Sequence, residues 1–204
     1  MKLCTIHLFG LLTLIAISLI LQGCMMMSHT IASADLLPQV QAGSPLKSVS
    51  PKTFAFKEFG DTRNISDPLL LMEAPFHKYK LDQPPAILVA EAIKKELERN
   101  GHICIDYSPQ SKADFIIEGT VYKYWSFYTS IAWTYNSTAN VAVKLTVSPF
   151  SGDKRVFIKN YEGEYVLNKA TYSPKEVKEV LSQALMEMLK EISTDSELIE
   201  FIEK

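Results

Sequence analysis

The sequence predicts an α+β fold in which a βαβ unit and an antiparallel meander form a sheet that packs against amphipathic helices. Three observations support this prediction. A strand, a helix and a strand follow one another over 53–106, the apolar period changes to two after residue 113, and a long apolar helical stripe closes the chain. Strands and helices ordered in this way are typical of layered α+β domains.

The first 23 residues have the pattern of a secretory signal. Lys2 gives one positive charge, residues 8–21 are apolar and uncharged, and the small residue Gly23 precedes Cys24. The apolar stretch is shorter than the roughly 20 residues that span a bilayer, which favours a cleaved signal over a transmembrane helix. We therefore expect 1–23 to be removed and the mature chain to begin at Cys24.

Residues 21–24, Leu-Gln-Gly-Cys, resemble the lipobox of bacterial lipoproteins, except that Gln22 is not the usual small residue. In that family the cysteine carries acyl groups, among which we expect palmitate. Two or three acyl chains anchor a soluble domain stably, whereas one binds only marginally. Met25 stands where an Asp would resemble an inner-membrane retention signal, so we expect anchoring on the periplasmic face of the outer membrane. The alternative is an ordinary signal peptide with an incidental cysteine.

Residues 24–50 show no apolar period and predict a flexible tether, with His29 solvated, followed by a single domain over 51–204. Removal of 1–23 leaves 204 − 23 = 181 residues. Only Lys2 is lost among the charged residues, which leaves 20 basic and 23 acidic residues, a net charge of −3. This charge is not that of a nucleic-acid-binding protein.

The domain begins with a strand over 53–59, which is rich in aromatic residues and ends at a glycine. A long connection follows over 61–83, in which residues 67–68, Asp-Pro, could start a short helix. A clearer helix over 84–100 has apolar residues at helical spacing and ends at Asn-Gly, typical of a left-handed C-cap. The strand over 102–106 follows at once and completes the βαβ unit.

The next three segments predict an antiparallel meander. Alternation of apolar residues indicates strands over 115–122, 141–147 and 155–165, with a turn at 151–153.

The closing helix has the plainest pattern in the chain. Ser173 and Glu176 form a capping box with Pro at the first helical position, and an apolar stripe extends to Ile192. A last short helix is expected after Asp195. These helices would cover the sheet.

No pattern in the sequence predicts catalysis, a metal site or a cofactor. His29, His77 and His102 lack metal-ligand spacing, and there is no phosphate loop, nucleophile elbow or cysteine pair for zinc. Cys104 lies between two isoleucines, which indicates a buried apolar role. We therefore expect a protein that is not an enzyme.

Aromatic residues are concentrated in one short stretch. Seven occur within fourteen residues: Tyr122, Tyr124, Trp125, Phe127, Tyr128, Trp133 and Tyr135. Adjacent aromatics on a strand face opposite ways, so some of these rings lie outside the main core, unless the long connection or the final helix covers them. Exposed aromatic clusters mark contact surfaces. The predicted partner-binding residues are Trp125, Tyr128, Trp133 and Tyr135, with Trp133 nearest the hairpin tip.

Residues 113–121, Ala-Asp-Phe-Ile-Ile-Glu-Gly-Thr-Val, resemble a strand of YajG-like lipoproteins and of the auxiliary lipoproteins of ABC-type transport systems. The helix that ends in Asn-Gly, the segments 61–63 and 151–153, and the closing helix extend the resemblance over about 52–192. The resemblance implies a non-catalytic periplasmic component that assists transport.

The sequence therefore predicts a lipid-anchored, non-enzymatic envelope lipoprotein that binds a protein or lipid partner in envelope transport or maintenance. The alternative is a lipoprotein that holds a small apolar ligand between sheet and helix. A closed groove at the aromatic hairpin would favour the ligand, and an open apolar face would favour the partner.

Overall fold

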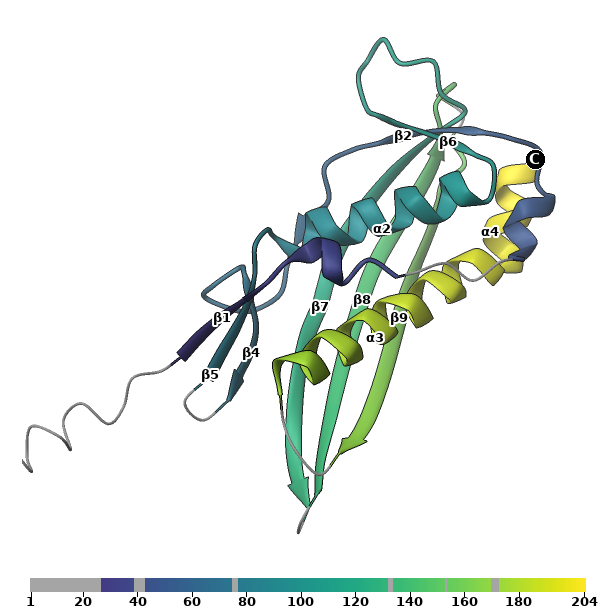
Figure 1. Ribbon diagram of the computed structural model, residues 1–204. Helices are drawn as coiled ribbons and strands as arrows, with labels where there is room; N and C mark the ends of the chain where they lie inside the picture. The colour runs from purple at the N-terminus through teal and green to yellow at the C-terminus, as the bar shows by residue number, and fades with distance from the viewer. Residues whose placement is uncertain (1–26, 39–42, 75–76, 132–133, 153, 170–172) are drawn as a thin grey trace, which may run out of the picture.

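The computed structural model describes residues 27–38, 43–74, 77–131, 134–152, 154–169 and 173–204. Figure 1 shows two long helices lying across one face of a long sheet, with a second, smaller sheet beside them. The elements in chain order are β1 (Met27–Ile31), η1 (Ser33–Asp35), η2 (Pro45–Ser48), β2 (Thr53–Phe56), β3 (Gly60–Asp61), β4 (Leu70–Ala74), β5 (His77–Leu81), α2 (Pro85–Arg99), β6 (Ile103–Asp106), β7 (Phe115–Ile131), β8 (Thr134–Pro149), β9 (Phe157–Lys169), α3 (Pro174–Thr194) and α4 (Ser196–Glu203).

The larger sheet has the strand order β6-β2-β7-β8-β9, with β3 paired to β7 off this path. Strand β2 is parallel to both β6 and β7, so β2, α2 and β6 form the predicted βαβ unit. Strands β7, β8 and β9 are antiparallel and form the predicted meander. The α+β fold class is therefore confirmed.

Helix α3 packs closely on the sheet because β9 carries a glycine beneath it. A Cβ atom on Gly163 would lie 1.9 Å from the carbonyl oxygen of Ala184 in α3. The apolar stripe of α3 is buried as predicted, with Leu181 and Leu185 fully buried. At the start of the helix the backbone N–H of Ser173 donates to the Glu176 carboxylate at 2.9 Å, which is one half of the predicted capping box.

The strands of the meander are longer than the alternation in the sequence predicts. The register of β7 against β8 shifts between Val121 and Lys123, where one extra residue forms a β-bulge. Val121 and Tyr124 are both fully buried although they are three positions apart. The break in alternation is therefore a bulge within one strand, and β7 continues to Ile131 instead of ending near Tyr122.

The long connection does not contain the short helix that residues 67–68 suggest. It forms β3 and the β4–β5 hairpin instead. The Asp67 carboxylate accepts a hydrogen bond from the Leu69 N–H at 3.0 Å and pairs with Lys80 at 2.5 Å. Asp67 thus stabilises the turn that leads into β4. The same kind of side-chain hydrogen bond that would cap a helix here precedes a strand.

The predicted flexible tether over 24–50 is wrong for its described part. Strand β1 pairs in parallel with β5 and joins β4 in the three-stranded second sheet. Leu36 and Leu46 are fully buried, and the Ser44 hydroxyl donates to the Ser193 carbonyl at 2.6 Å. Isolated apolar residues such as Leu36 and Leu46, which form no periodic pattern in the sequence, pack this segment against the domain. Cys24 and the predicted signal 1–23 lie outside the described residues.

None of the described helices is both long and apolar enough to cross a membrane.

Candidate functional site

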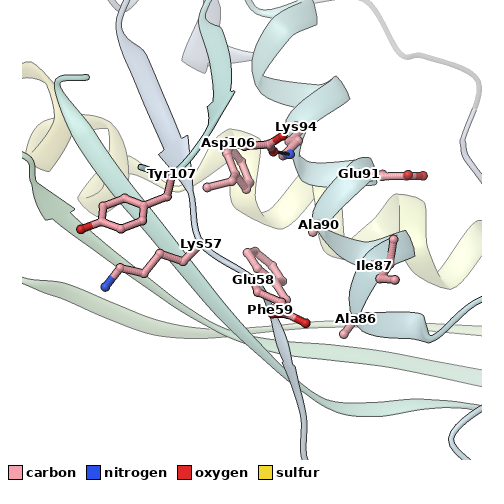
Figure 2. Close-up of a pocket in the computed structure, with 11 residues that line it drawn as sticks. Lys57, Glu58, Phe59, Ala86, Ile87, Ala90, Glu91, Lys94, Asp106 and Tyr107 are labelled. Carbon is pink, nitrogen blue, oxygen red and sulfur yellow. Dashed lines mark hydrogen bonds and ion pairs between the residues drawn. The ribbon is translucent and has the colours of Figure 1, made fainter. Parts of the chain in front are cut away.

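An open groove of about 650 Å³ lies where the parallel strands β2 and β6 end (Figure 2). Crevices at the carboxyl ends of parallel strands are frequent ligand sites in α/β sheets. Residues 56–59 form one wall, α2 from Ala86 to Lys94 forms the other, and Asp106 and Tyr107 close one end. The rings of Phe56 and Phe59 make the groove largely apolar.

Two lysines of the groove are neutralised by carboxylates. Lys94 pairs with Asp106 at 2.5 Å, and Lys57 pairs with Glu118 on β7. The hydrogen bond to Glu118 raises the pKa of Lys57 above its ordinary value. Both ammonium groups also lie over aromatic rings: Lys57 Nζ is 5.1 Å from the Tyr107 centroid and Lys94 Nζ is 5.2 Å from the Phe56 centroid. The lysines therefore order the aromatic rings of the groove.

Two further carboxylates, Glu58 and Glu91, line the groove without an ion-pair partner among the described residues. Ile87 on α2 is 46% exposed beside them. An exposed apolar side chain flanked by acidic groups is suited to a partner that presents apolar and basic side chains.

The glycine of the 113–121 strand makes room for a wall of the groove. A Cβ atom on Gly119 would lie 2.2 Å from the Phe59 ring. The missing side chain on β7 therefore lets Phe59 pack flat on the sheet, where it is 7% exposed. The sequence shows this glycine, but its contact with Phe59, sixty residues away, appears only in the fold.

The structure separates the predicted aromatic site into two faces. Tyr128 and Tyr135 lie together, with ring centroids 6.2 Å apart, on the face of the sheet that also buries Tyr124. Trp125 lies on the opposite face and is half-buried, near Phe127, which is 43% exposed. Trp133 lies outside the described residues.

The long connection covers part of this aromatic strand, which was one of the two possibilities open from the sequence. A shallow hollow of about 310 Å³ remains between β4 and β7, lined by Ile65, Leu70, Leu71, Met72, Glu73, Tyr124, Trp125, Ser126 and Phe127. The hydroxyls of Tyr124 and Ser126 are buried and have no hydrogen-bond partner among the described residues. Burial raises the pKa of Tyr124.

Arg63 fixes the long connection to the edge of β7. Its buried guanidinium pairs with Asp61 at 2.7 Å and donates to the carbonyls of Leu70 at 3.2 Å and Tyr124 at 3.0 Å. Burial opposes ionisation of Asp61, but the hydrogen bonds from Arg63 outweigh it and hold the pKa of Asp61 below its ordinary value. The position of Arg63 in a polar loop gives no sign of this role.

The structure brings together two histidines that are 48 residues apart in the sequence. His29 on β1 and His77 on β5 lie with Nε2 and Nδ1 3.0 Å apart, so His29 is not solvated in a tether. Within the described residues, no cluster of three or more His, Cys, Asp or Glu side chains is placed to hold a metal ion. Burial raises the pKa of the Cys104 thiol to about 12, which keeps it protonated and poorly nucleophilic.

The described surface thus combines an open groove, a shallow hollow and an aromatic hairpin on an α+β domain. The model of a family described as uncharacterized lipoprotein matches residues 72–203, which is more than half of the chain. The protein therefore belongs to this family of lipoproteins, and membership implies association with the cell envelope. A search of curated protein sequences gives no significant match.

Three solved structures are similar to this chain to different degrees. Protein XCC0632 from Xanthomonas campestris is 15% identical, with a TM-score of 0.55 over 80% of this chain and 92% of that chain. The hypothetical protein CT253 from Chlamydia trachomatis is 12% identical, with a TM-score of 0.45 over 76% and 96%. The lipoprotein GNA1162 from Neisseria meningitidis is 14% identical, with a TM-score of 0.31 over 65% and 94%. The first of these shows a shared fold and nothing further.

Proposed function

We propose that the protein is a non-enzymatic envelope lipoprotein, held on the periplasmic face of the outer membrane by acyl groups on Cys24, that binds an extended segment of a partner protein in the groove beside α2. The resemblance of residues 113–121 to YajG-like and transport-auxiliary lipoproteins supports a role in envelope transport or maintenance. Family membership supports the lipid anchor, since the family is one of lipoproteins.

The groove is the observation that supports binding of a partner protein. The groove is open, aromatic rings form part of one wall, and two of its carboxylates have no ion-pair partner among the described residues. An open apolar surface with a polar rim fits a protein segment better than a small molecule, which is normally enclosed over most of its surface. The partner segment would carry an apolar anchor near Ile87 and a basic residue opposite Glu58 or Glu91.

Introduction of a charge at the exposed apolar residue of the groove tests the proposal. The full chain is purified from native membranes in mild detergent, as wild type, Ile87→Glu and Ile103→Glu, and the co-purified proteins are compared by mass spectrometry. Ile103 is a matched control, because it is 57% exposed on the edge strand β6 and does not line the groove. We expect the partner to be lost with Ile87→Glu and retained with Ile103→Glu. Equal recovery with both variants would show that the groove is not the site.

The second candidate function is the binding of a small apolar ligand in the hollow between β4 and β7. The two buried hydroxyls of Tyr124 and Ser126 support it, because buried polar groups normally have hydrogen-bond partners. Native mass spectrometry of protein extracted from its own membranes tests this function. A bound small molecule that Ser126→Ala weakens would favour the ligand, and a mass equal to that of the acylated chain would reject it.

A further inference from the structure

The first strand of the domain begins close to the proposed lipid. Strand β1 starts at Met27, three residues after Cys24, and is fixed to β5 in the register Met27↔His77. Because an extended chain spans at most about 3.6 Å per residue, the start of β1 lies within roughly 11 Å of Cys24. A lipid on Cys24 would therefore hold this end of the domain at the bilayer surface. This step rests on the proposed function.

The same end of the molecule carries the aromatic hairpin. Figure 1 shows that β1 begins and β4 ends at the lower left of the view, and that β7 ends below them at the bottom. Strand β4 also packs beside β7, since Leu70 to Glu73 and Tyr124 to Phe127 line one hollow. The β7–β8 hairpin end, which we define as residues 127–131 and 134–138, therefore lies in the same lower part of the molecule as the start of β1 (Figure 1).

The hairpin end is free of charge to an unusual degree. Residues 124–143 contain no Asp, Glu, Lys or Arg, although 22% of the chain is charged. On the neighbouring strand, Glu164 pairs in register with Asn140, and Lys169 pairs with Tyr135 near the tip. On β9, the charge that lies level with the hairpin end is thus basic, and Glu164 lies farther up the sheet.

Apolar and aromatic groups lie on both faces of the hairpin end. On one face, Phe127 is 43% exposed and Val166 is 50% exposed, on either side of Thr138. On the other face lie the rings of Tyr128 and Tyr135. Tyrosine rings, which combine an apolar body with a hydroxyl, are enriched at the boundary between lipid and water.

We propose that the β7–β8 hairpin end docks on the lipid bilayer as a second membrane contact beside the acyl groups on Cys24. Four observations support the bilayer as the occupant. The chain between Cys24 and β1 is short, and the hairpin end lies in the same lower part of the molecule as the start of β1 (Figure 1). Residues 124–143 carry no charge, and aromatic rings lie on both faces of the hairpin end. Lys169 would lie near anionic headgroups, which attract basic residues. The contact limits the tilt of the domain on the membrane.

Tryptophan fluorescence on vesicles tests this proposal. The full acylated chain carrying Trp125→Phe keeps Trp133, between β7 and β8, as its single tryptophan. It is reconstituted in vesicles of phosphatidylcholine and phosphatidylglycerol, with and without brominated acyl chains, which quench nearby indoles. Phe127→Ser removes the exposed ring of the hairpin end. Ile158→Ser is the matched control, because Ile158 is 57% exposed on the same strand as Val166 but at its other end.

We expect brominated lipid to quench Trp133, with the quenching lost in Phe127→Ser and retained in Ile158→Ser. Unquenched emission from acylated protein bound to vesicles would overturn the proposal. Shielding of Trp133 from iodide in native membranes, without quenching in pure lipid, would assign the hairpin end to a protein and also overturn it. The mass of the purified chain reports acylation separately, so failure of the lipid anchor is distinguished from failure of the hairpin contact.

Discussion

Replacement of Gly163 by alanine tests the closest contact between helix and sheet. The added Cβ would lie 1.9 Å from the Ala184 carbonyl oxygen and 2.6 Å from the Met188 nitrogen. Both are backbone atoms, so no side chain can rotate away. Since real Cβ atoms essentially never approach closer than 3.0 Å, α3 must move from β9 by at least 3.0 − 1.9 = 1.1 Å.

The displacement has a predictable cost. Overpacking of a well-packed core costs about 1–3 kcal/mol, and this site belongs at the upper end because α3 carries much of the core, including Leu181 and Leu185. Alanine is favoured over glycine inside a strand by roughly 0.5–1 kcal/mol, which offsets part of that cost. We expect a net loss of about 2 kcal/mol in the free energy of unfolding.

Urea denaturation followed by circular dichroism measures this loss. Gly60→Ala is the control, because its Cβ would meet nothing closer than the Thr120 hydroxyl oxygen at 3.8 Å. Gly60 is exposed on β3, so we expect a change within about 0.5 kcal/mol. A midpoint for Gly163→Ala equal to that of Gly60→Ala would refute the close packing of α3 on β9.

Three further predictions concern the anchor and the core. Cys24→Ser should block acylation and release of the 23-residue signal, and mass spectrometry of the membrane fraction would contradict this by finding a mature chain that starts elsewhere. Leu185→Ala should cost about 2–5 kcal/mol, because the side chain is fully buried, and an unchanged denaturation midpoint would exclude its packing. The Tyr161 hydroxyl donates to Asp195 at 2.5 Å, so Tyr161→Phe should cost about 1.5–3 kcal/mol at pH 7. Burial opposes ionisation of Asp195, but hydrogen bonds from Tyr161 and Lys159 hold its pKa below the ordinary value, so this stabilisation exists above about pH 4 and is lost as pH falls through the lowered pKa. A difference between variant and wild type that is the same at pH 3 and pH 7 would contradict the last prediction.

The elements that the sequence predicts well have patterns within a single segment. The stripe of α3, its Glu176 cap, and the alternation of 115–121 each depend on residues close together in the chain. Such patterns determine which face of an element is apolar before any tertiary contact is known. They also predicted the βαβ unit, because the Asn-Gly end of α2 leaves little chain before β6.

The features that the sequence does not predict depend on contacts between distant segments. Strand β1 exists because β5, fifty residues later, provides its hydrogen-bond partners. The bulge after Val121 reverses the alternation, so Tyr124, Trp125, Phe127 and Tyr128 continue β7 where the sequence indicates the end of a strand. The groove combines three segments, none of which has a motif of its own. A single apolar residue such as Leu46 gives no period to detect.

The two proposed surfaces lie far apart along the larger sheet, the groove beside β2 and α2 and the hairpin end at the far end of β7. Phe56 at the groove pairs in register with Ile117, and the hairpin end finishes at Ile131, fourteen residues along β7. At about 3.3 Å per residue this separation is roughly 46 Å, more than the thickness of a whole bilayer. A hairpin on the membrane would therefore hold the groove well above the lipid headgroups, within reach of a periplasmic partner. For this reason Phe127→Ser should impair the lipid contact without loss of the partner, and Ile87→Glu should do the reverse. Loss of both contacts in either variant would mean that the two surfaces act as one.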